Sequence, residues 1–360
     1  MNVGTEPLRP DSPEESLSES VERQASSQQP SPGGAATAGR VMADDMLPPV
    51  EPPSAGFLVQ LFLVPGVIVA IIVGVYLTFY WLAHLGNDPQ AYLRALRRDS
   101  EGRWQAALNF ANDLRGPGGT SLKQDATLAT EVGSVLEDEV AKGRTSEQSQ
   151  QLKFFLCKAL GEFAVPEAAA PLVARAADLS DLETAQAAVE ALGQLSSNLK
   201  NAKKTVANPE MIVEVILEAS RQTDAKIRYA AAYTLGVLGG NKAVERLLAM
   251  KDDASDTVRF NVATALARNG RDEAYDGLAE MLALDDIEAG PDEQSQSDRY
   301  NRALVVVNAL RAVVMLVDDS GQPPPGRILS RIEELGEDPV SNVRASASAV
   351  LEKVRRLSSP

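Results

Sequence analysis

A short sequence phrase recurs through the last two thirds of this chain. It consists of an acidic residue, an aliphatic residue followed by a basic one, small residues, and then Leu followed by Gly or Ala. The two clearest copies lie 31 residues apart and comprise Asp224, Ile227, Arg228, Leu235 and Gly236, and Asp256, Val258, Arg259 and Leu266. A unit of this length holds about two helices and cannot bury its apolar face alone, so successive units must stack. The phrase therefore predicts an all-α solenoid.

Weaker copies surround this pair. One upstream copy contains Asp181, Leu192 and Gly193, and the last copy contains Val343, Arg344 and Leu351. Lys153 and Ala185 stand where other copies have arginine, and a degenerate unit lies around Arg302. The spacing between copies varies from about 31 to 44 residues, which indicates that the loops vary while the helical hairpin persists.

Each residue type in the phrase has a mechanical role. Ile227, Ala231 and Leu235 recur every four residues, which places them on one helix face and predicts that this face is core. Asp224 and Asp256 precede their helices, where a carboxylate caps free backbone N–H groups. We expect Arg228 and Arg259 to lie beside the aspartate of a neighbouring repeat and to form a ladder along the stack. Repetition in every unit is typical of packing residues rather than catalytic ones.

The stretches DAKIRYAAAYTLGVLG, residues 224–239, and DTVRFNVATALARNG, residues 256–270, carry a family resemblance. The chain resembles a HEAT-repeat protein, and in particular the short bacterial type related to phycobilisome-lyase HEAT-like repeats. The resemblance covers roughly residues 150–357 and extends more weakly back to about residue 88. It implies a right-handed α-solenoid of about six or seven helical hairpins. Ala185 replaces the family's usual basic residue, and Lys153 replaces its usual arginine.

An uncharged segment precedes the repeats. No Asp, Glu, Lys or Arg lies between Glu51 and Asp88, and the apolar run is longer than the roughly 20 residues that cross a bilayer. Aromatic residues gather near its carboxyl end, where their rings favour the membrane interface. Residues 56–86 are therefore predicted to form one transmembrane helix. The run begins too far along the chain and is too long for a cleaved signal peptide.

The distribution of basic residues predicts the orientation of this helix. Within about 20 residues of its ends, the segment is preceded by one basic residue, Arg40, and followed by four arginines, namely Arg94, Arg97, Arg98 and Arg103. The positive-inside tendency then places the solenoid in the cytoplasm and the tail outside. The single cysteine, Cys157, cannot form an internal disulfide and shows no adaptation to an oxidising compartment. We expect a single-pass protein of a bacterial inner membrane.

Charge and composition narrow the partners. Residues 1–55 contain no aromatic residue and carry nine acidic residues against three basic ones, which predicts a disordered tail. The whole chain has a net charge of −15, and this balance disfavours binding to nucleic acid, which requires concentrated Lys and Arg. The basic cluster Tyr92–Arg98 is explained equally well by attraction to anionic lipid headgroups and by a structural role in a first helix.

The residues needed for chemistry are few. The sole histidine, His84, lies at the end of the apolar segment, so neither a Ser-His-Asp triad nor a histidine-based metal cluster can be assembled. No phosphate-binding glycine loop is present, and Cys157 is expected to be a buried, inert thiol. We therefore expect no enzyme activity, no cofactor and no metal site. Two loops, residues 287–299 and 321–327, interrupt the repeats and are candidates for shaping a binding surface.

These observations divide the chain into four parts: a disordered acidic tail at 1–55, a transmembrane helix at 56–86, juxtamembrane helices and a degenerate first repeat at 87–150, and the repeat solenoid at 151–360. The function predicted for this architecture is a membrane-tethered, non-catalytic scaffold whose concave surface binds a protein. Two alternatives stay open. One is a lyase or chaperone for a phycobilin-like prosthetic group, which only the repeat resemblance implies, and the other is a self-assembling component of the membrane or envelope.

Overall fold

A computed structural model describes residues 55–84, 89–285 and 293–357. The chain divides into two units, Met1–Val69 and Ala70–Pro360. Helix α1 (Ala55–His84) contains Val59–Thr78, which is long and apolar enough to cross a membrane and is not buried against the protein. Residues 1–54 of the predicted disordered tail lie outside the described residues, and Ala55 is the first residue of α1. No strand occurs in the described ranges.

The helices that follow come in pairs that match the predicted hairpins. They are α2 (Pro89–Arg97), α3 (Arg103–Arg115), α4 (Ala126–Ala141), α5 (Glu147–Glu162), α6 (Ala169–Ala177), α7 (Leu182–Asn201), α8 (Pro209–Ala219), α9 (Ala225–Leu238), α10 (Gly240–Ala249), α11 (Asp256–Arg268), α12 (Ala274–Leu282), α13 (Glu293–Ser320), α14 (Gly326–Leu335) and α15 (Ser341–Leu357). Short 3₁₀ turns at Pro117–Gly119, Leu122–Gln124 and Pro166–Ala168 lie in the loops. Pairing each even-numbered helix with the next odd-numbered one gives seven hairpins within the described residues.

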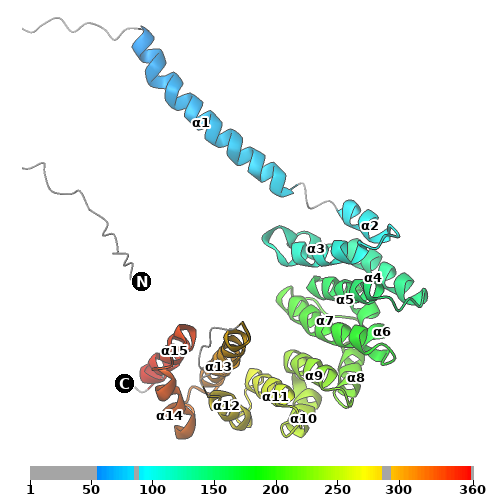
Figure 1. Ribbon diagram of the computed structural model, residues 1–360, viewed down its shortest axis with the longest axis vertical. Helices are drawn as coiled ribbons and strands as arrows, with labels where there is room; N and C mark the ends of the chain where they lie inside the picture. The colour runs from blue at the N-terminus through cyan, green and yellow to red at the C-terminus, as the bar shows by residue number, and fades with distance from the viewer. Residues whose placement is uncertain (1–54, 85–88, 286–292, 358–360) are drawn as a thin grey trace, which may run out of the picture. The chain divides into compact units, whose positions relative to one another are not determined.

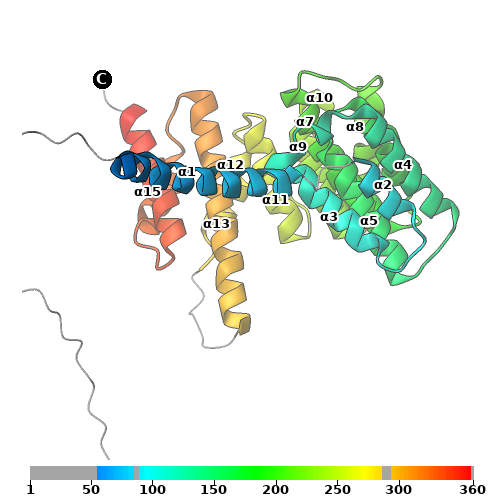
Figure 2. The ribbon, with the colours of Figure 1, turned by 90° about the horizontal axis from the view of Figure 1, so that it is seen from above.

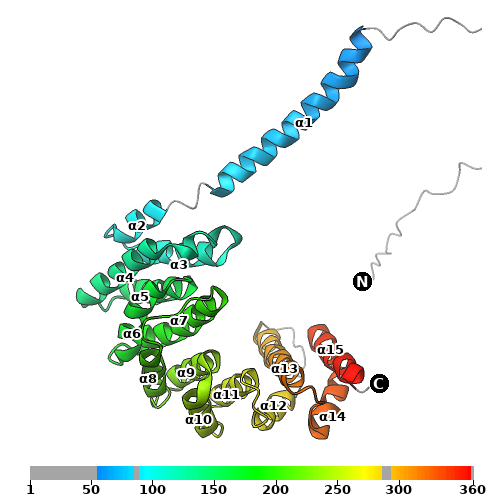
Figure 3. The same cartoon turned by 180° about the vertical axis from the view of Figure 1, so that it is seen from behind.

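The hairpins stack to form an α-helical solenoid. Each odd-numbered helix from α3 to α13 packs against the next odd-numbered helix, and the even-numbered helices form a second row. Figure 1 and, from behind, Figure 3 show these two rows, which we call the odd row and the even row. All copies of the sequence phrase lie on the odd row.

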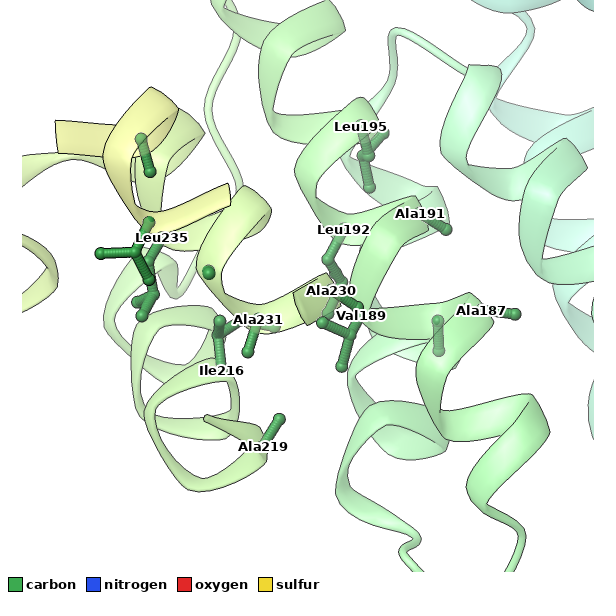
Figure 4. Close-up of a cluster of buried hydrophobic side chains, with 14 of the residues drawn as sticks. Ala187, Val189, Ala191, Leu192, Leu195, Ile216, Ala219, Ala230, Ala231 and Leu235 are labelled. Atoms are coloured by element: carbon green, nitrogen blue, oxygen red, sulfur yellow. The ribbon is translucent and has the colours of Figure 1, made fainter. Parts of the chain in front are cut away.

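One continuous apolar core joins the hairpins and runs from Leu93 to Val354. Figure 4 shows its centre, where Leu192 of α7, Ile216 of α8 and Leu235 of α9 meet around small alanine side chains. The small residues permit close helix packing: a Cβ built on Gly236 would lie 2.5 Å from the Cβ of Ala265. The glycine in the phrase is thus required by the approach of the next odd helix rather than by a turn.

Side-chain caps begin several of the repeat helices. Asp181 and Asp224 accept hydrogen bonds from the first backbone N–H groups of α7 and α9. The expected cap by Asp256 is wrong, because Ser255 is the residue at the N-cap position and Asp256 lies inside the first turn of α11. The 31-residue repeat explains the difference, since it places Ser255, and not Asp256, opposite Asp224.

The structure also corrects one predicted loop. Residues 293–299 belong to α13, and the rest of the predicted loop at 287–299, up to residue 292, lies outside the described residues. These seven residues are polar because the first turns of α13 are largely exposed, and Gln294 donates a hydrogen bond to Asp298 one turn later. The second predicted loop, 321–327, connects α13 to α14, which begins at Gly326.

Candidate binding surface

A repeated hydrogen bond anchors each clear copy of the phrase to its own loop. The guanidinium of Arg228 donates to the carbonyl of Gln222 at 3.0 Å, six residues earlier in the chain. Arg259 donates to the carbonyl of Asp253 at 2.8 Å and Arg344 to that of Asp338 at 2.6 Å, with the same six-residue separation. The basic residue of the phrase therefore holds the turn that leads into its helix.

A second set of contacts links consecutive hairpins. Arg228 makes two hydrogen bonds to the carboxylate of Asp253, at 2.7 and 2.8 Å, and both side chains are largely buried. Equivalent pairs join four other junctions: Arg103 with Glu139, Lys153 with Asp181, Arg259 with Glu280, and Arg302 with Asp338. We call these five pairs the cation ladder. Each pair joins a basic residue of an odd helix to an acidic residue of the following hairpin.

The ladder has one gap, between the hairpins α6–α7 and α8–α9. Ala185 stands at the basic position of α7 and is fully buried. The position that would supply the carboxylate, six residues before Arg228, is Gln222. Thr234 bridges this junction instead, by donating from its hydroxyl to the carbonyl of Val189 at 2.8 Å. Both members of the pair are thus missing together, and no buried charge is left alone.

The predicted repeat positions lie in two environments. The core positions are buried residues, namely Leu192, Gly193, Ile227, Leu235, Gly236, Val258, Leu266 and Val343, whereas Leu351 is half-buried. The charged positions Asp181, Arg228 and Arg259 belong to the ladder, Asp224 caps α9, and Arg344 holds its own turn. Asp256 pairs with Arg259 within α11. These residues are occupied by contacts within the solenoid.

Aromatic side chains that sequence reasoning missed mark a different surface. From Pro89 onward in the described residues, all but one of the aromatic side chains that retain exposure lie on the odd row. They are Trp104, Phe154, Phe155, Tyr229, Tyr233, Phe260 and Tyr300, and the exception is Tyr92 on α2. A signal for part of this set is in the sequence, because Tyr229 and Tyr233 are four residues apart and are offset by two from the core positions Ile227 and Ala231. That offset turns them about 200° away from the core.

A groove crosses four helices of the odd row. It has a volume of about 370 Å³ and is lined by residues of α3, α5, α7 and α9. Arg115 and Glu162 form a hydrogen-bonded ion pair at 2.9 Å on one side, and Lys158 pairs with Glu190 across α5 and α7. Charges of both signs therefore line the groove and already have partners.

The tyrosines at the other side of the groove retain unused polar groups. Tyr229 is 41% exposed, and burial of the rest of its ring raises its pKa. Tyr233 lies beneath the guanidinium of Arg268 at 5.6 Å from the ring centroid. Neither tyrosine hydroxyl has a hydrogen-bond partner among the described residues. An apolar ring with a free hydroxyl is typical of the anchors of protein interfaces.

Groups with chemical reactivity are not concentrated at this groove. Cys157 is fully buried, and burial raises the pKa of its thiol to about 12. A thiol with this pKa remains protonated at neutral pH and is a poor nucleophile. The described residues also contain no group of three or more His, Cys, Asp or Glu side chains that could hold a metal ion.

The basic cluster after α1 has a structural role that accounts for part of its charge. Arg97 pairs with Glu131 of α4. Arg103 is buried, donates to the carbonyl of Leu96 at 2.7 Å and pairs with Glu139 at 2.9 Å. Within the cluster Tyr92–Arg98 the structure thus gives an ion-pair role to Arg97, while the buried Arg103 lies five residues beyond the cluster.

A match to a protein-family model agrees with this architecture. Residues 208–289, which contain α8 to α12, match the family model described as HEAT repeats. The chain is also similar to a crystal structure of an engineered protein, with 18% identity, a TM-score of 0.34, and coverage of 75% of this chain and 98% of that chain. The chain is similar to human deoxyhypusine hydroxylase in complex with glycerol, with 19% identity, a TM-score of 0.31, and coverage of 74% of this chain and 96% of that chain. It is also similar to a designed armadillo repeat protein in complex with the peptide (KR)4, with 16% identity, a TM-score of 0.31, and coverage of 69% of this chain and 99% of that chain. No curated protein matches the chain.

Proposed function

We propose that this HEAT-repeat solenoid is a non-catalytic scaffold, tethered to a membrane by α1, that binds a protein on its odd row. The single observation that carries the proposal is the placement of the exposed aromatic side chains. Aromatic residues make up only 5% of the chain, yet in the solenoid those that retain exposure lie almost entirely on one of its two rows. A purely structural stack would have no reason to favour one row in this way.

The chemistry of the odd row fits a protein partner. Tyr and Trp side chains supply large contact area with little loss of conformational entropy, and they dominate binding energy at protein interfaces. Trp104 and Phe155 lie with ring centroids 6.1 Å apart, which joins α3 to α5 and gives a rigid apolar platform. The groove across α3 to α9 offers the hydroxyls of Tyr229 and Tyr233, which have no hydrogen-bond partner among the described residues, for orienting a partner. Its lining is more polar than is usual for a pocket that binds a drug-sized ligand.

Helix α1 supports the membrane tether. Its apolar stretch Val59–Thr78 has a mean hydropathy of 2.6, and its side chains are exposed. An exposed apolar surface of this length requires cover, and a bilayer supplies it without a protein partner. We propose that the solenoid lies on the cytoplasmic side, following the arginines after α1.

The lyase alternative receives no support from the solenoid. Attachment of a bilin to a cysteine thiol, which forms a thioether bond, would be assisted by an accessible nucleophile or acid in a groove, but Cys157 is buried with a raised pKa. The charged groups of the odd-row groove are paired with one another. A scaffold that only binds a protein needs no accessible nucleophile or acid, so these observations favour the non-catalytic proposal over the lyase.

Photo-crosslinking tests the binding surface. A photoreactive benzoyl-phenylalanine replaces Tyr229 on the odd row or, as the control, Glu245 on α10 of the even row. We expect a discrete crosslinked protein from position 229 and none from position 245, and we expect Tyr233→Ala to weaken the crosslink. Equal crosslinking from both rows would contradict the proposal.

Alkaline extraction tests the tether separately. Full-length protein should remain in the membrane pellet after carbonate treatment, and removal of residues 55–84 should release it into the supernatant. Release of the intact chain would show that α1 is not an integral anchor, while leaving the photo-crosslinking result valid.

A further inference from the structure

Helix α13 differs in length from its neighbours in the odd row. It has 28 residues, compared with 13 in α11 and 17 in α15. Figure 2 shows that one end of α13 extends beyond the adjacent helices. A stack of equal hairpins needs no such extension, and most residues of the additional turns, 293–301, are exposed.

A groove lies between this helix and α15, with a volume of about 770 Å³. On α13 its lining residues follow one helical stripe, namely Gln296, Arg299, Tyr300, Ala303, Leu304, Val307 and Arg311. The other wall is the start of α15 and the turn before it, which contributes Val340, Asn342 and Ala345. Tyr300 is 64% exposed and Leu304 43%, so the groove has a large uncovered apolar surface.

The charge of this groove is opposite to that of the chain. The sequence has 50 acidic residues against 35 basic ones, yet the groove is lined by two arginines and by no Asp or Glu. Among the described residues, the exposed Arg311 has no carboxylate partner. The amino end of α15 adds the positive end of a helix dipole to the same site. The groove therefore combines an apolar floor with a positive potential.

We propose that the groove between α13 and α15 is a docking site for an amphipathic helix of a partner protein, with apolar residues on one face and acidic residues beside it. The stripe from Gln296 to Arg311 is about 22 Å long at 1.5 Å per residue, which fits about four turns of an incoming helix. Apolar side chains of that helix cover Tyr300 and Leu304, and its carboxylates reach Arg311. This is helix-in-groove recognition, in which anchors recur three or four residues apart.

Other occupants fit the observations less well. A membrane surface is contacted by protruding apolar side chains, whereas Tyr300 and Leu304 line a concavity between two helices. The acidic tail of this chain lies on the other side of the bilayer if α1 spans it. A second copy offers few apolar anchors for this groove, because among the described helices other than α1 and α13 none exposes more than one large apolar side chain.

The site is separate from the groove across α3 to α9, so its test is independent of the proposed function. The full-length chain in mild detergent is titrated into a fluorescent 16-residue peptide with Leu three and four residues apart and Glu at the remaining positions. Detergent alone is the blank, and the same peptide with Lys in place of Glu tests charge. We expect saturable binding of the Glu peptide, at least about tenfold tighter than that of the Lys peptide, and weaker binding as salt is raised.

Three variants locate the binding site. Leu304→Glu and Arg311→Glu should each weaken binding of the Glu peptide by about tenfold or more. Met315→Glu is the matched control, because Met315 is also on α13 and also 43% exposed but does not line the groove. Circular dichroism verifies that each variant is folded.

The proposal is overturned by any of three results. One is that the folded chain binds neither peptide, and another is that Met315→Glu weakens binding as much as Leu304→Glu. The third is that another occupant takes this groove, seen either as a dimer that Leu304→Glu converts to a monomer in sedimentation or as competition with the peptide by anionic but not by neutral vesicles.

Discussion

Arg228 combines two tasks that usually belong to different residues. Its guanidinium holds the turn before its own helix, through the carbonyls of Gln222 and Thr223, and it also pairs with Asp253 of the next hairpin. The phrase in the sequence predicted the arginine and its link to a neighbouring repeat. The predicted partners, the helix-starting aspartates Asp224 and Asp256 of neighbouring copies, are wrong. The carboxylate that Arg228 contacts is Asp253, which lies in a loop three residues before α11 and outside the positions that repeat visibly. The spacing that identifies this partner is a carboxylate six residues before the basic residue of the next copy. Asp253 precedes Arg259 by six residues, and Asp338 likewise precedes Arg344 by six.

Replacing Arg228 should destabilise the solenoid. Arg228→Ala removes four hydrogen bonds and leaves the carboxylate of Asp253, which is 10% exposed, without its cation. We expect a loss of about 1–3 kcal/mol in the free energy of unfolding. Urea denaturation measures the loss, and Arg271→Ala is the control because Arg271 is exposed and, among the described residues, pairs only with the nearby Glu273. If the two variants unfold at the same urea concentration, the ladder contributes no stability.

The glycine of the phrase provides a second test at this scale. Gly236→Ala places a methyl group 2.5 Å from the Cβ of Ala265, so α9 and α11 must move apart. Overpacking of this kind costs about 1–3 kcal/mol, although alanine favours the helix itself by about 1 kcal/mol. We expect net destabilisation in thermal melts. Gly102→Ala is the control, since its added Cβ meets no atom closer than 3.7 Å, and an unchanged melting temperature for Gly236→Ala would refute the close-packing account.

At the scale of helices, periodicity predicted the odd-row helices better than the features between them. The four-residue spacing of Ile227, Ala231 and Leu235 fixes a buried face whatever the loops do. The start of α13 was missed because its first residues are polar and show no apolar period, which is what exposure of those turns requires. The groove between α13 and α15 could not be inferred at all, since it joins residues about 40 positions apart through packing that no local pattern records.

The ladder carboxylates predict how stability varies with pH. Hydrogen bonds from Arg228 lower the pKa of Asp253, while burial opposes this shift. Burial alone would raise the pKa of Asp181, but the hydrogen bond from Lys153 outweighs burial and the pKa is lowered. In the same way burial would raise the pKa of Glu139, but hydrogen bonds from Ser149 and Arg103 lower it. Because these values are depressed in the folded state, the stability that the groups add is present above their unfolded pKa, near 4, and is lost as pH falls through the folded value.

Urea midpoints measured from pH 7 to pH 2.5 should therefore fall steeply below about pH 4. Asp253→Asn should have a lower midpoint at pH 7 and a shallower decline with acid, because one of the depressed carboxyls is absent. A decline in Asp253→Asn as steep as in the unmodified chain would mean that this pair is not a source of the acid sensitivity.

At the scale of the whole molecule, the proposed tether predicts on which side of the membrane the solenoid lies. The arginines that follow α1 favour a cytoplasmic solenoid, and this tendency acts on their charge whether or not they later form ion pairs. A protease added to intact cells should remove the tail and leave the solenoid uncut, as detected by antibodies against each part. Cells made permeable serve as the control in which the solenoid becomes accessible. Digestion of the solenoid in intact cells, with a protected tail, would reverse the orientation.

The gap in the cation ladder limits how such an array can change its length. Suppose that unequal recombination duplicated the hairpin α8–α9 in tandem. The first copy of Arg228 would then face the second copy of Gln222 in place of Asp253, and a largely buried guanidinium would lose its counter-ion. A duplication of α10–α11 would instead preserve Asp253 opposite Arg228 at its first junction. Hairpins in this chain are thus not interchangeable modules, and their order is constrained by which loop carries the acid that the preceding helix needs.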